Sequence, residues 1–127
     1  MRAVLDASAL MAYFRQEPGG DVVADLLTSE ARVSSLNWSE VHQKLGRLGL
    51  DADMLTTRLL DVGVKVEPFD QADAVVASKL YRATSPGGVS LADRACLALG
   101  YRLGVPVYSA DRQWSRIDVC ADVRMIR

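Results

Sequence analysis

Short apolar runs alternate with helical segments along this chain, and the alternation is the feature that most limits its possible folds. Strands are expected at residues 2–6, 31–35, 64–69, 105–109 and 123–126. Helical patterns occupy residues 9–16, 21–29, 37–49, 51–62, 70–83 and 90–103. Continuously apolar strands separated by helices are typical of a parallel sheet with both faces covered. The sequence therefore predicts an α/β fold, a three-layer sandwich in which helices flank a mostly parallel central sheet.

Polar residues and glycines mark the expected ends of these helices. Capping side chains are expected at Ser8, Asn37, Asp70 and Ser90. Gly104 should end the late helix, and a turn is expected at residues 85–88. In the helix over residues 70–83, the predicted apolar stripe comprises Ala74, Val75, Ala77 and Leu80.

Length and composition indicate one globular domain. The chain has 127 residues, of which 50% are hydrophobic, and its net charge of -1 excludes a generally basic nucleic-acid-coating protein. Cys96 and Cys120 show neither a disulfide framework nor zinc-ligand spacing, so both are expected as free thiols. No apolar run reaches membrane-spanning length, and Asp6 and Arg15 interrupt the run near the N-terminus. We therefore expect a soluble cytoplasmic protein with no membrane partner.

Four acidic residues stand at comparable positions in the pattern. Asp6 ends the first strand, and Glu40 lies near the start of the helix after the second. Asp93 lies in the first turn of the late helix, and Asp111 follows the strand at 105–109. Because ligands of open α/β sheets bind outside the carboxyl ends of the strands, acids in these places can converge although they are distant in sequence.

Such a cluster of carboxylates indicates a metal site. Convergent carboxylates repel one another unless a cation lies between them. Oxygen ligands without a matching His or Cys cluster favour Mg²⁺ or Mn²⁺ over zinc. These ions suit phosphodiester hydrolysis, because they lower the pKa of an attacking water and neutralise the charge that grows on the phosphate and the leaving oxygen.

Helix capping is an alternative explanation for three of the acids. Glu40 and Asp93 each stand at capping-box spacing from a polar residue three positions earlier. Asp111 could likewise cap a short helix of its own. Asp6 is different, because Ser8 is available to cap the first helix and a carboxylate ending an apolar run is costly unless it is paired or metal-bound. The functional interpretation therefore depends on the four acids together.

The segments that carry these acids resemble a PIN domain, and more narrowly the VapC toxins of VapB-VapC toxin-antitoxin pairs. They are VLDASAL at residues 4–10, NWSEV at 37–41, SLADRACLAL at 90–99 and VYSADRQW at 107–114. They occur in the family's order and spacing over nearly the whole chain. The resemblance implies a single PIN domain over residues 1–127, with a PIN-like three-layer sandwich.

The resemblance also implies roles for individual residues. The family's catalytic, metal-binding acids correspond to Asp6, Glu40, Asp93 and Asp111, with Mg²⁺ or Mn²⁺ as the cofactor. Its hydroxyl residues that position the substrate or a water correspond to Ser8 and Ser109. The implied activity is that of an endoribonuclease, which cleaves RNA with a metal-activated water and leaves 5′-phosphate and 3′-hydroxyl ends.

Two protein partners are implied by the same resemblance. One is a VapB-type antitoxin that blocks the active site, and the helices at 9–16 and 22–29 are expected to contribute to its groove. The other is a second copy of the chain in a homodimer. The four acids do not distinguish ribonucleases that cleave tRNA, ribosomal RNA or messenger RNA, so the RNA target cannot be predicted from them.

Other residues invite functional interpretations but have simpler ones. Arg94 and Arg112 directly follow two of the acids and could contact RNA phosphate, with ion pairing to neighbours as the alternative. The single histidine, His42, is expected to have a structural role. Trp38 and Trp114 are expected to pack at a helix start or a subunit interface rather than to stack on bases.

Two other functions compete with the nuclease. A Mg²⁺-dependent acid-cluster phosphatase or receiver-like domain also places Asp at strand ends, but the phosphatase usually has a second Asp where this chain has Ser8. A catalytically silent PIN-fold binding module is the other alternative, and the presence of all four acids argues against it. Acid-dependent cleavage of RNA distinguishes all three.

Overall fold

A computed structural model describes residues 2–84, 88–119 and 121–127. Its five strands form one sheet in the order β3-β2-β1-β4-β5, and every pairing between neighbours is parallel. The strands are β1 (Ala3–Leu5), β2 (Ala31–Ser34), β3 (Lys65–Glu67), β4 (Val107–Ser109) and β5 (Val123–Met125). The predicted α/β class is confirmed, and the sheet is wholly parallel.

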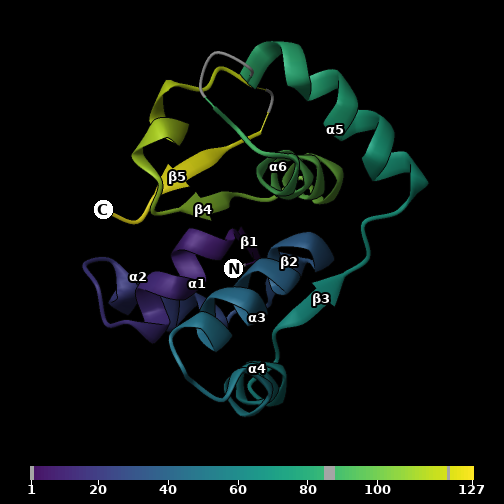
Figure 1. Ribbon diagram of the computed structural model, residues 1–127. Coiled ribbons are helices and arrows are strands. Elements are labelled where there is room, and N and C mark those ends of the chain that lie inside the picture. The colour runs from purple at the N-terminus through teal and green to yellow at the C-terminus, as the bar shows by residue number, and fades with distance from the viewer. Residues whose placement is uncertain (1, 85–87, 120) are drawn as a thin grey trace.

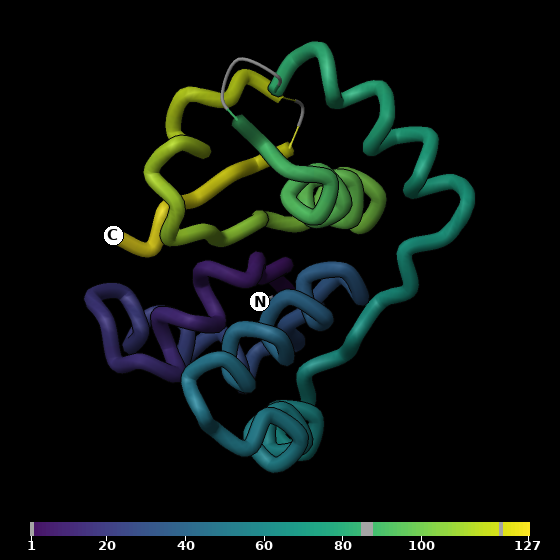
Figure 2. The backbone as a smooth tube through the Cα atoms, in the orientation of Figure 1, coloured from purple at the N-terminus to yellow at the C-terminus, as the bar shows by residue number. Residues whose placement is uncertain are grey.

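Helices cover both faces of this sheet. They are α1 (Ala7–Phe14), α2 (Gly20–Leu27), α3 (Ser35–Arg47), α4 (Ala52–Asp61), α5 (Gln71–Thr84) and α6 (Leu91–Leu103), with a short 3-10 helix η2 (Arg112–Arg116). Figure 1 shows α1 to α4 on one side of the sheet and α5, α6 and η2 on the other. The chain crosses between the two sides after β3, and Figure 2 shows the short extended connection, residues 68–70, that leads to α5. The predicted three-layer sandwich is confirmed.

The central strand β1 contributes to two separate parts of the hydrophobic core. Successive side chains of a strand point to opposite faces. Ala3 and Leu5 belong to the cluster formed with α1 to α4, whereas Val4 belongs to the cluster formed with α6, β4 and η2. All three side chains are fully buried. This explains why β1 reads as an uninterrupted apolar run.

Several predicted helix ends are confirmed. Ser90 and Asp93 form a reciprocal capping box at the start of α6, and Gly104 ends this helix in the left-handed conformation. Asp70 accepts a hydrogen bond from the Asp73 amide at the start of α5 (2.9 Å). The structure does not describe residues 85–87, which make up most of the turn expected at 85–88, nor the second cysteine, Cys120. Cys96 is a buried free thiol, as expected.

The predicted apolar stripe of α5 is wrong in two of its four members. Val75 is 51% exposed, and Ala74 is also exposed. The face that packs inward instead carries Asp73 and Ala77 with the partly buried Leu80. Asp73 can be buried because Arg102 of α6 donates to both of its carboxylate oxygens, at 3.0 and 3.2 Å.

Within the described residues, no helix combines the length and the apolar composition needed to cross a bilayer.

The contact between α6 and β4 sets how closely this layer approaches the sheet. A Cβ added at Gly100 of α6 would collide with Cγ2 of Val107 in β4. Gly46 of α3 has nothing within 4 Å of such a Cβ. We therefore predict that Gly100→Ala lowers the free energy of unfolding by about 1–3 kcal/mol, because overpacking outweighs the gain in helix propensity.

The matched variant Gly46→Ala should instead raise the free energy of unfolding by about 0.5–1 kcal/mol, because alanine loses less conformational entropy in a helix. Urea unfolding of Gly46→Ala, Gly100→Ala, Val107→Ala and the combination of Gly100→Ala with Val107→Ala measures this. The combination should lose less stability than the losses of Gly100→Ala and Val107→Ala added together. Strict additivity would show that the two residues are not in contact.

Candidate active site

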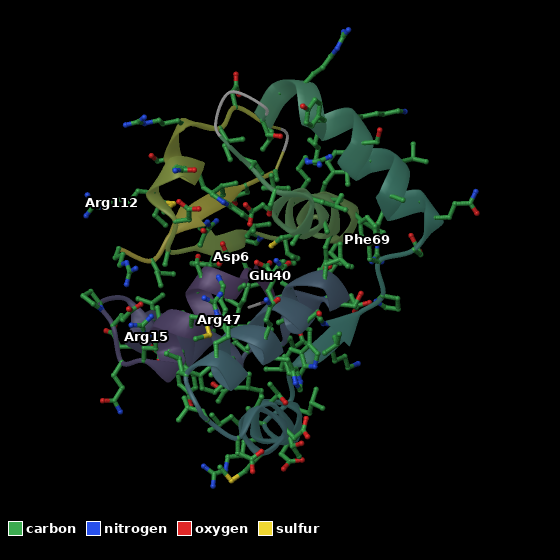
Figure 3. All side chains as sticks on the ribbon, in the orientation of Figure 1. Asp6, Arg15, Glu40, Arg47, Phe69 and Arg112 are labelled. Carbon is green, nitrogen blue, oxygen red and sulfur yellow. The ribbon has the colours of Figure 1, made fainter. Side chains whose placement is uncertain are left out.

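The sheet order brings three chain segments to one edge. β1 lies between β2 and β4, so the residues that follow these three strands emerge next to one another. Asp6 directly follows β1, and α3 begins directly after β2. Ser109 is the last residue of β4, and Asp111 follows it by two positions. Figure 3 shows Asp6 and Glu40 close to each other near the centre of the view.

Asp6 is buried at this edge, with only 2% of its surface exposed. Its Oδ1 accepts from the Ala9 amide (2.7 Å), which makes Asp6 the N-cap of α1. The Ser8 hydroxyl donates to the carboxylate (2.8 Å), and the Ser109 hydroxyl donates to Oδ2 (2.6 Å). The expectation that Ser8 caps this helix is therefore wrong. The reason is that β1 already ends at Leu5, so Asp6 rather than Ser8 occupies the extended position before the first turn.

Burial makes Asp6 an unusually weak acid. It raises the pKa of the carboxyl from 3.8 to about 6, and the negative charge of Asp93 adds to the rise. The hydrogen bonds from Ser109, Ala9 and Ser8 act in the opposite direction without cancelling the cost of burial. A carboxylate that is this costly to ionise suggests a cation partner.

Asn37 holds Glu40 in place, which the sequence analysis did not anticipate. The amide Nδ2 of Asn37 donates to Oε1 of Glu40 (3.1 Å) and to the carbonyl of Ala92 (3.3 Å). The expectation that Asn37 caps this helix is wrong, because Ser34 does so by accepting from the Leu36 amide. Asn37 is fully buried, and its Oδ1 has no hydrogen-bond partner among the residues that the structure describes. The signal available in the sequence was an Asn three residues before an acid, a spacing that places both side chains on one face of the helix.

Asp93 and Asp111 combine helix capping with a place at the same edge. The Asp93 carboxylate accepts from the Ser90 amide (3.2 Å), and that of Asp111 accepts from the Gln113 amide (3.0 Å). Burial raises the pKa of Asp93; the hydrogen bonds with Ser90 lower it, the charge of Asp111 raises it, and the charge of Lys44 lowers it. The edge of the sheet at which Asp6, Glu40, Asp93 and Asp111 stand is called the acidic edge below. Capping a helix and taking part in this edge are compatible for Asp93 and Asp111.

The buried thiol of Cys96 gives a further sign that the acids converge. Burial raises its pKa well above the usual value, and the negative charges of Asp6, Asp93 and Glu40 raise it further. Three acids from three elements therefore act on one buried point. Within residues 2–84, 88–119 and 121–127, however, no three His, Cys, Asp or Glu side chains are grouped closely enough to hold a metal ion as they stand. A shared metal site stays a prediction.

The side chains of the two arginines next to the acids have different surroundings. Arg94 donates to the carbonyl of Ala77 (2.9 Å), and its guanidinium lies 5.2 Å from the centre of the Tyr81 ring. It therefore ties α6 to α5 instead of forming the expected ion pair. Arg112 is exposed, and Figure 3 shows it far from Asp6 and Glu40. Neither position favours contact with a phosphate at the acids.

The remaining residues of interest have structural contacts. Nε2 of His42 lies 3.0 Å from Oγ1 of Thr56, which links α3 to α4. Trp114 is buried in the part of the core formed with α6 and β4, whereas the partly buried Trp38 packs against the part formed with α1 to α4. These placements agree with the structural roles expected from the sequence.

The pKa of Asp6 gives a prediction for stability. The folded state holds this proton more tightly than the unfolded state, so the free energy of unfolding of metal-free protein should fall as pH rises from about 4 through about 6. The fall due to Asp6 should be on the order of 3 kcal/mol, since one pKa unit corresponds to about 1.4 kcal/mol. Asp6→Asn does not titrate and caps a helix as well as Asp does, so this variant should lose that part of the pH dependence.

Urea unfolding in EDTA between about pH 4 and pH 7 measures the difference between wild type and Asp6→Asn. Near neutral pH the variant should be as stable as wild type or slightly more stable. Asp25→Asn, at an exposed position in α2, is the control and should follow the wild-type curve. An Asp6→Asn protein with the wild-type pH slope would show that Asp6 titrates normally.

Comparisons with known proteins agree with this architecture. The sequence matches the PIN domain family over residues 3–119. Among curated proteins, no sequence matches this chain.

Three solved structures illustrate the likeness in fold. A chain of DNA-bound VapBC from Salmonella typhimurium has a TM-score of 0.75 and 14% identity, with 100% of this chain and 99% of that chain covered. Mycobacterium tuberculosis VapC20, described as a sarcin-ricin loop cleaving toxin, has a TM-score of 0.72 and 17% identity, with 90% and 93% covered. A chain of FitAcB from Neisseria gonorrhoeae has a TM-score of 0.69 and 21% identity, with 98% and 96% covered.

At these identities the structural likeness shows the fold and not the activity. The family match is independent of it and spans nearly the whole sequence. The protein therefore belongs to the PIN domain family.

Proposed function

We propose that this protein is a metal-dependent endoribonuclease, the VapC-type toxin of a type II toxin-antitoxin pair. The observation that carries the proposal is the acidic edge, where buried Asp6 lies between the ends of β2 and β4, and Asn37 ties Glu40 to the start of α6 next to Asp93. Membership of the PIN domain family and similarity to toxin structures support it. The single PIN domain is proposed to extend over residues 1–127.

The donor set fits a hard divalent cation. Asp6, Glu40, Asp93 and Asp111 offer only oxygen ligands, and the unpartnered Oδ1 of Asn37 adds a buried oxygen beside Glu40. These four acids would hold Mg²⁺ or Mn²⁺. When bound, such an ion lowers the pKa of the attacking water and neutralises charge on the phosphate.

The protein's own residues orient this edge. Ser8 and Ser109 both donate to Asp6, so they hold its carboxylate in one position. Asn37 fixes Glu40 relative to the start of α6, where Asp93 lies. In the proposed reaction the water oxygen attacks phosphorus, the bond from phosphorus to the 3′ oxygen breaks, and that oxygen takes up a proton. The products carry 5′-phosphate and 3′-hydroxyl ends.

We predict that purified protein cleaves single-stranded or loop RNA when Mg²⁺ or Mn²⁺ is present. Asp93→Asn should lower the rate at least about 100-fold, because it removes a charge that faces the cation. EDTA should abolish cleavage, and added metal should raise the melting temperature of wild type more than that of Asp6→Asn at constant ionic strength.

p-Nitrophenyl phosphate serves as the second substrate in this experiment. Turnover of the small ester without cleavage of RNA would favour the acid-cluster phosphatase. A protein that acts on neither substrate would fit the silent binding module. Cleavage that survives excess chelator would refute the metal mechanism.

The groove bounded by α1, α2 and α4 is proposed as the antitoxin site. It has a volume of about 1030 Å³, and its apolar lining includes Tyr13, Phe14, Leu55 and Leu59. The two early helices, which the sequence analysis expected to contribute to the antitoxin site, line this groove together with α4, which it did not mention. Such a groove suits the apolar face of a helical segment. Solved toxin-antitoxin complexes share the fold, which supports a VapB-type partner, and a homodimer is proposed on the same resemblance.

Tyr13→Glu should weaken binding of the cognate antitoxin at least about tenfold, because a charge would lie in the apolar groove. Val75→Glu, at an exposed position on α5, should leave binding unchanged. Isothermal titration with the antitoxin measures both, and circular dichroism checks that each variant is folded. Equal effects of the two substitutions would place the antitoxin elsewhere.

A further inference from the structure

Two helices that begin at the acidic edge carry cations further along the same faces. On α3, Glu40 is followed by Lys44 and Arg47, at the four- and three-residue intervals that keep side chains on one helix face. On α1, Ser8 is followed at the seven-residue interval by Arg15. α1 starts at the carboxyl end of β1, and α3 starts at the carboxyl end of β2. Each of these two helix faces therefore runs from the acidic edge to cationic side chains.

These two faces border one cleft, here called the α1–α3 cleft. Its volume is about 390 Å³, and its polar and charged lining consists of Ser8, Arg15, Glu17, Lys44, Arg47 and Arg127. Figure 3 shows Arg15 and Arg47 on the α1–α3 side of the molecule, below Asp6 and Glu40 in the view. Because the Ser8 hydroxyl donates to the Asp6 carboxylate, one end of the cleft adjoins the acidic edge.

The cations of the cleft differ in how far they are neutralised. Arg15 and Arg127 share one carboxylate, that of Glu17, at 3.7 and 3.4 Å. Lys44 and Arg47 are exposed, and among the described residues neither lies within ion-pair distance of a carboxylate. The positive charge of these two side chains is therefore available to a ligand.

The cationic part of this cleft lies next to the acidic edge. Lys44 is one helical turn beyond Glu40 on the same face of α3, and it lines the cleft together with Ser8. The whole chain has a net charge of -1, so the cationic cleft is a local feature and not part of a generally basic surface. With a rise of about 1.5 Å per residue, Arg47 lies roughly 10 Å along α3 from Glu40. A polyanion in the cleft would thus have one end at the acids.

We infer that the α1–α3 cleft binds backbone phosphates of single-stranded RNA next to the bond that is cut, with Lys44 and Arg47 as the main contacts. This inference rests on the proposed function. Phosphates beside the cleaved one must pass close to the acids, and uncompensated cations at that place offset the repulsion between the RNA and the acidic edge. Arginine offers two parallel donors to one phosphate, whereas lysine acts as a point charge.

The test uses full-length Asp93→Asn protein in EDTA, so that RNA is not cut during the measurement, and a fluorescently labelled single-stranded RNA. Affinity is measured by anisotropy over a series of salt concentrations. Adding Lys44→Gln and Arg47→Gln should weaken binding roughly tenfold, and should reduce the slope of log affinity against log salt by about 1.4, or 0.7 for each lost phosphate contact. Adding Arg82→Gln, an exposed cation in the last turn of α5, should change neither quantity.

Cleavage kinetics provide a second readout in the protein with Asp93 intact. Lys44→Gln with Arg47→Gln should raise KM roughly tenfold and leave kcat within about twofold, because contacts away from the reacting atoms bind substrate and transition state alike. If wild type cuts RNA but the double variant retains its KM and salt slope, the inference is wrong and the proposed function stands. If wild type cuts no RNA with either metal, the proposed function itself fails.

An acidic peptide is the competing ligand for such a cleft. Oligoglutamate of the same charge as the RNA is therefore titrated against the Asp93→Asn protein at the same ionic strength. RNA should bind at least about tenfold more tightly. Equal affinity, lost equally when Lys44 and Arg47 are neutralised, would assign the cleft to acidic peptide and overturn the inference.

Discussion

The Asp6 carboxylate joins the start of α1 to the end of β4 at the centre of the sheet. It accepts from the Ala9 amide and the Ser8 hydroxyl on one side and from the Ser109 hydroxyl on the other. The same side chain therefore caps a helix, connects two neighbouring strands that lie far apart in sequence, and supplies the buried acid of the candidate site. The positions of α1 and β4, and hence of the acids that follow, depend on this group of hydrogen bonds.

Burying an ionised Asp6 carboxylate lowers the stability of the folded protein, whereas a neutral side chain at this position would not. The hydrogen bonds stabilise the ionised carboxylate, but burial still raises its pKa to about 6. A neutral side chain of similar shape would serve the capping role at less cost. Retaining a carboxylate here makes sense if the protein uses the charge, which is the physical reason for placing Asp6 at the centre of the proposed nuclease site.

The sequence predicted the fold better than it predicted the contacts of individual side chains. The alternation of strands and helices was visible because buried parallel strands require continuous apolar runs, and β1 fits this rule on both faces. The burial of Asp73 was not visible, because it depends on Arg102 from another helix. The roles of Asp6 and Asn37 at their helix starts were misassigned for a related reason. The residue that caps each of these helices depends on where the preceding strand ends. A shift of one or two residues in that strand end changes which side chain can cap.

The acids of the candidate site could be named from the sequence, but their grouping could not be derived from it. Strand order decides which carboxyl ends are neighbours, and the order β3-β2-β1-β4-β5 follows from long-range packing. The cationic cleft was missed for a similar reason, since its two walls belong to helices separated by about twenty residues of chain. Helical spacing can place the residues of each wall on one helix face, but only the fold shows that the two walls face each other.

The central place of β1 has a consequence for the order in which the protein takes shape during synthesis. One edge of β1 can pair with β2 early, but its other edge pairs with β4, about a hundred residues later in the chain. Until that strand leaves the ribosome, Asp6 lacks its hydrogen bond from Ser109, and Asp111 is not yet in place. The complete group of hydrogen bonds around Asp6 therefore assembles only after the chain has been synthesised through Ser109, and a shorter nascent chain has only the part formed with α1.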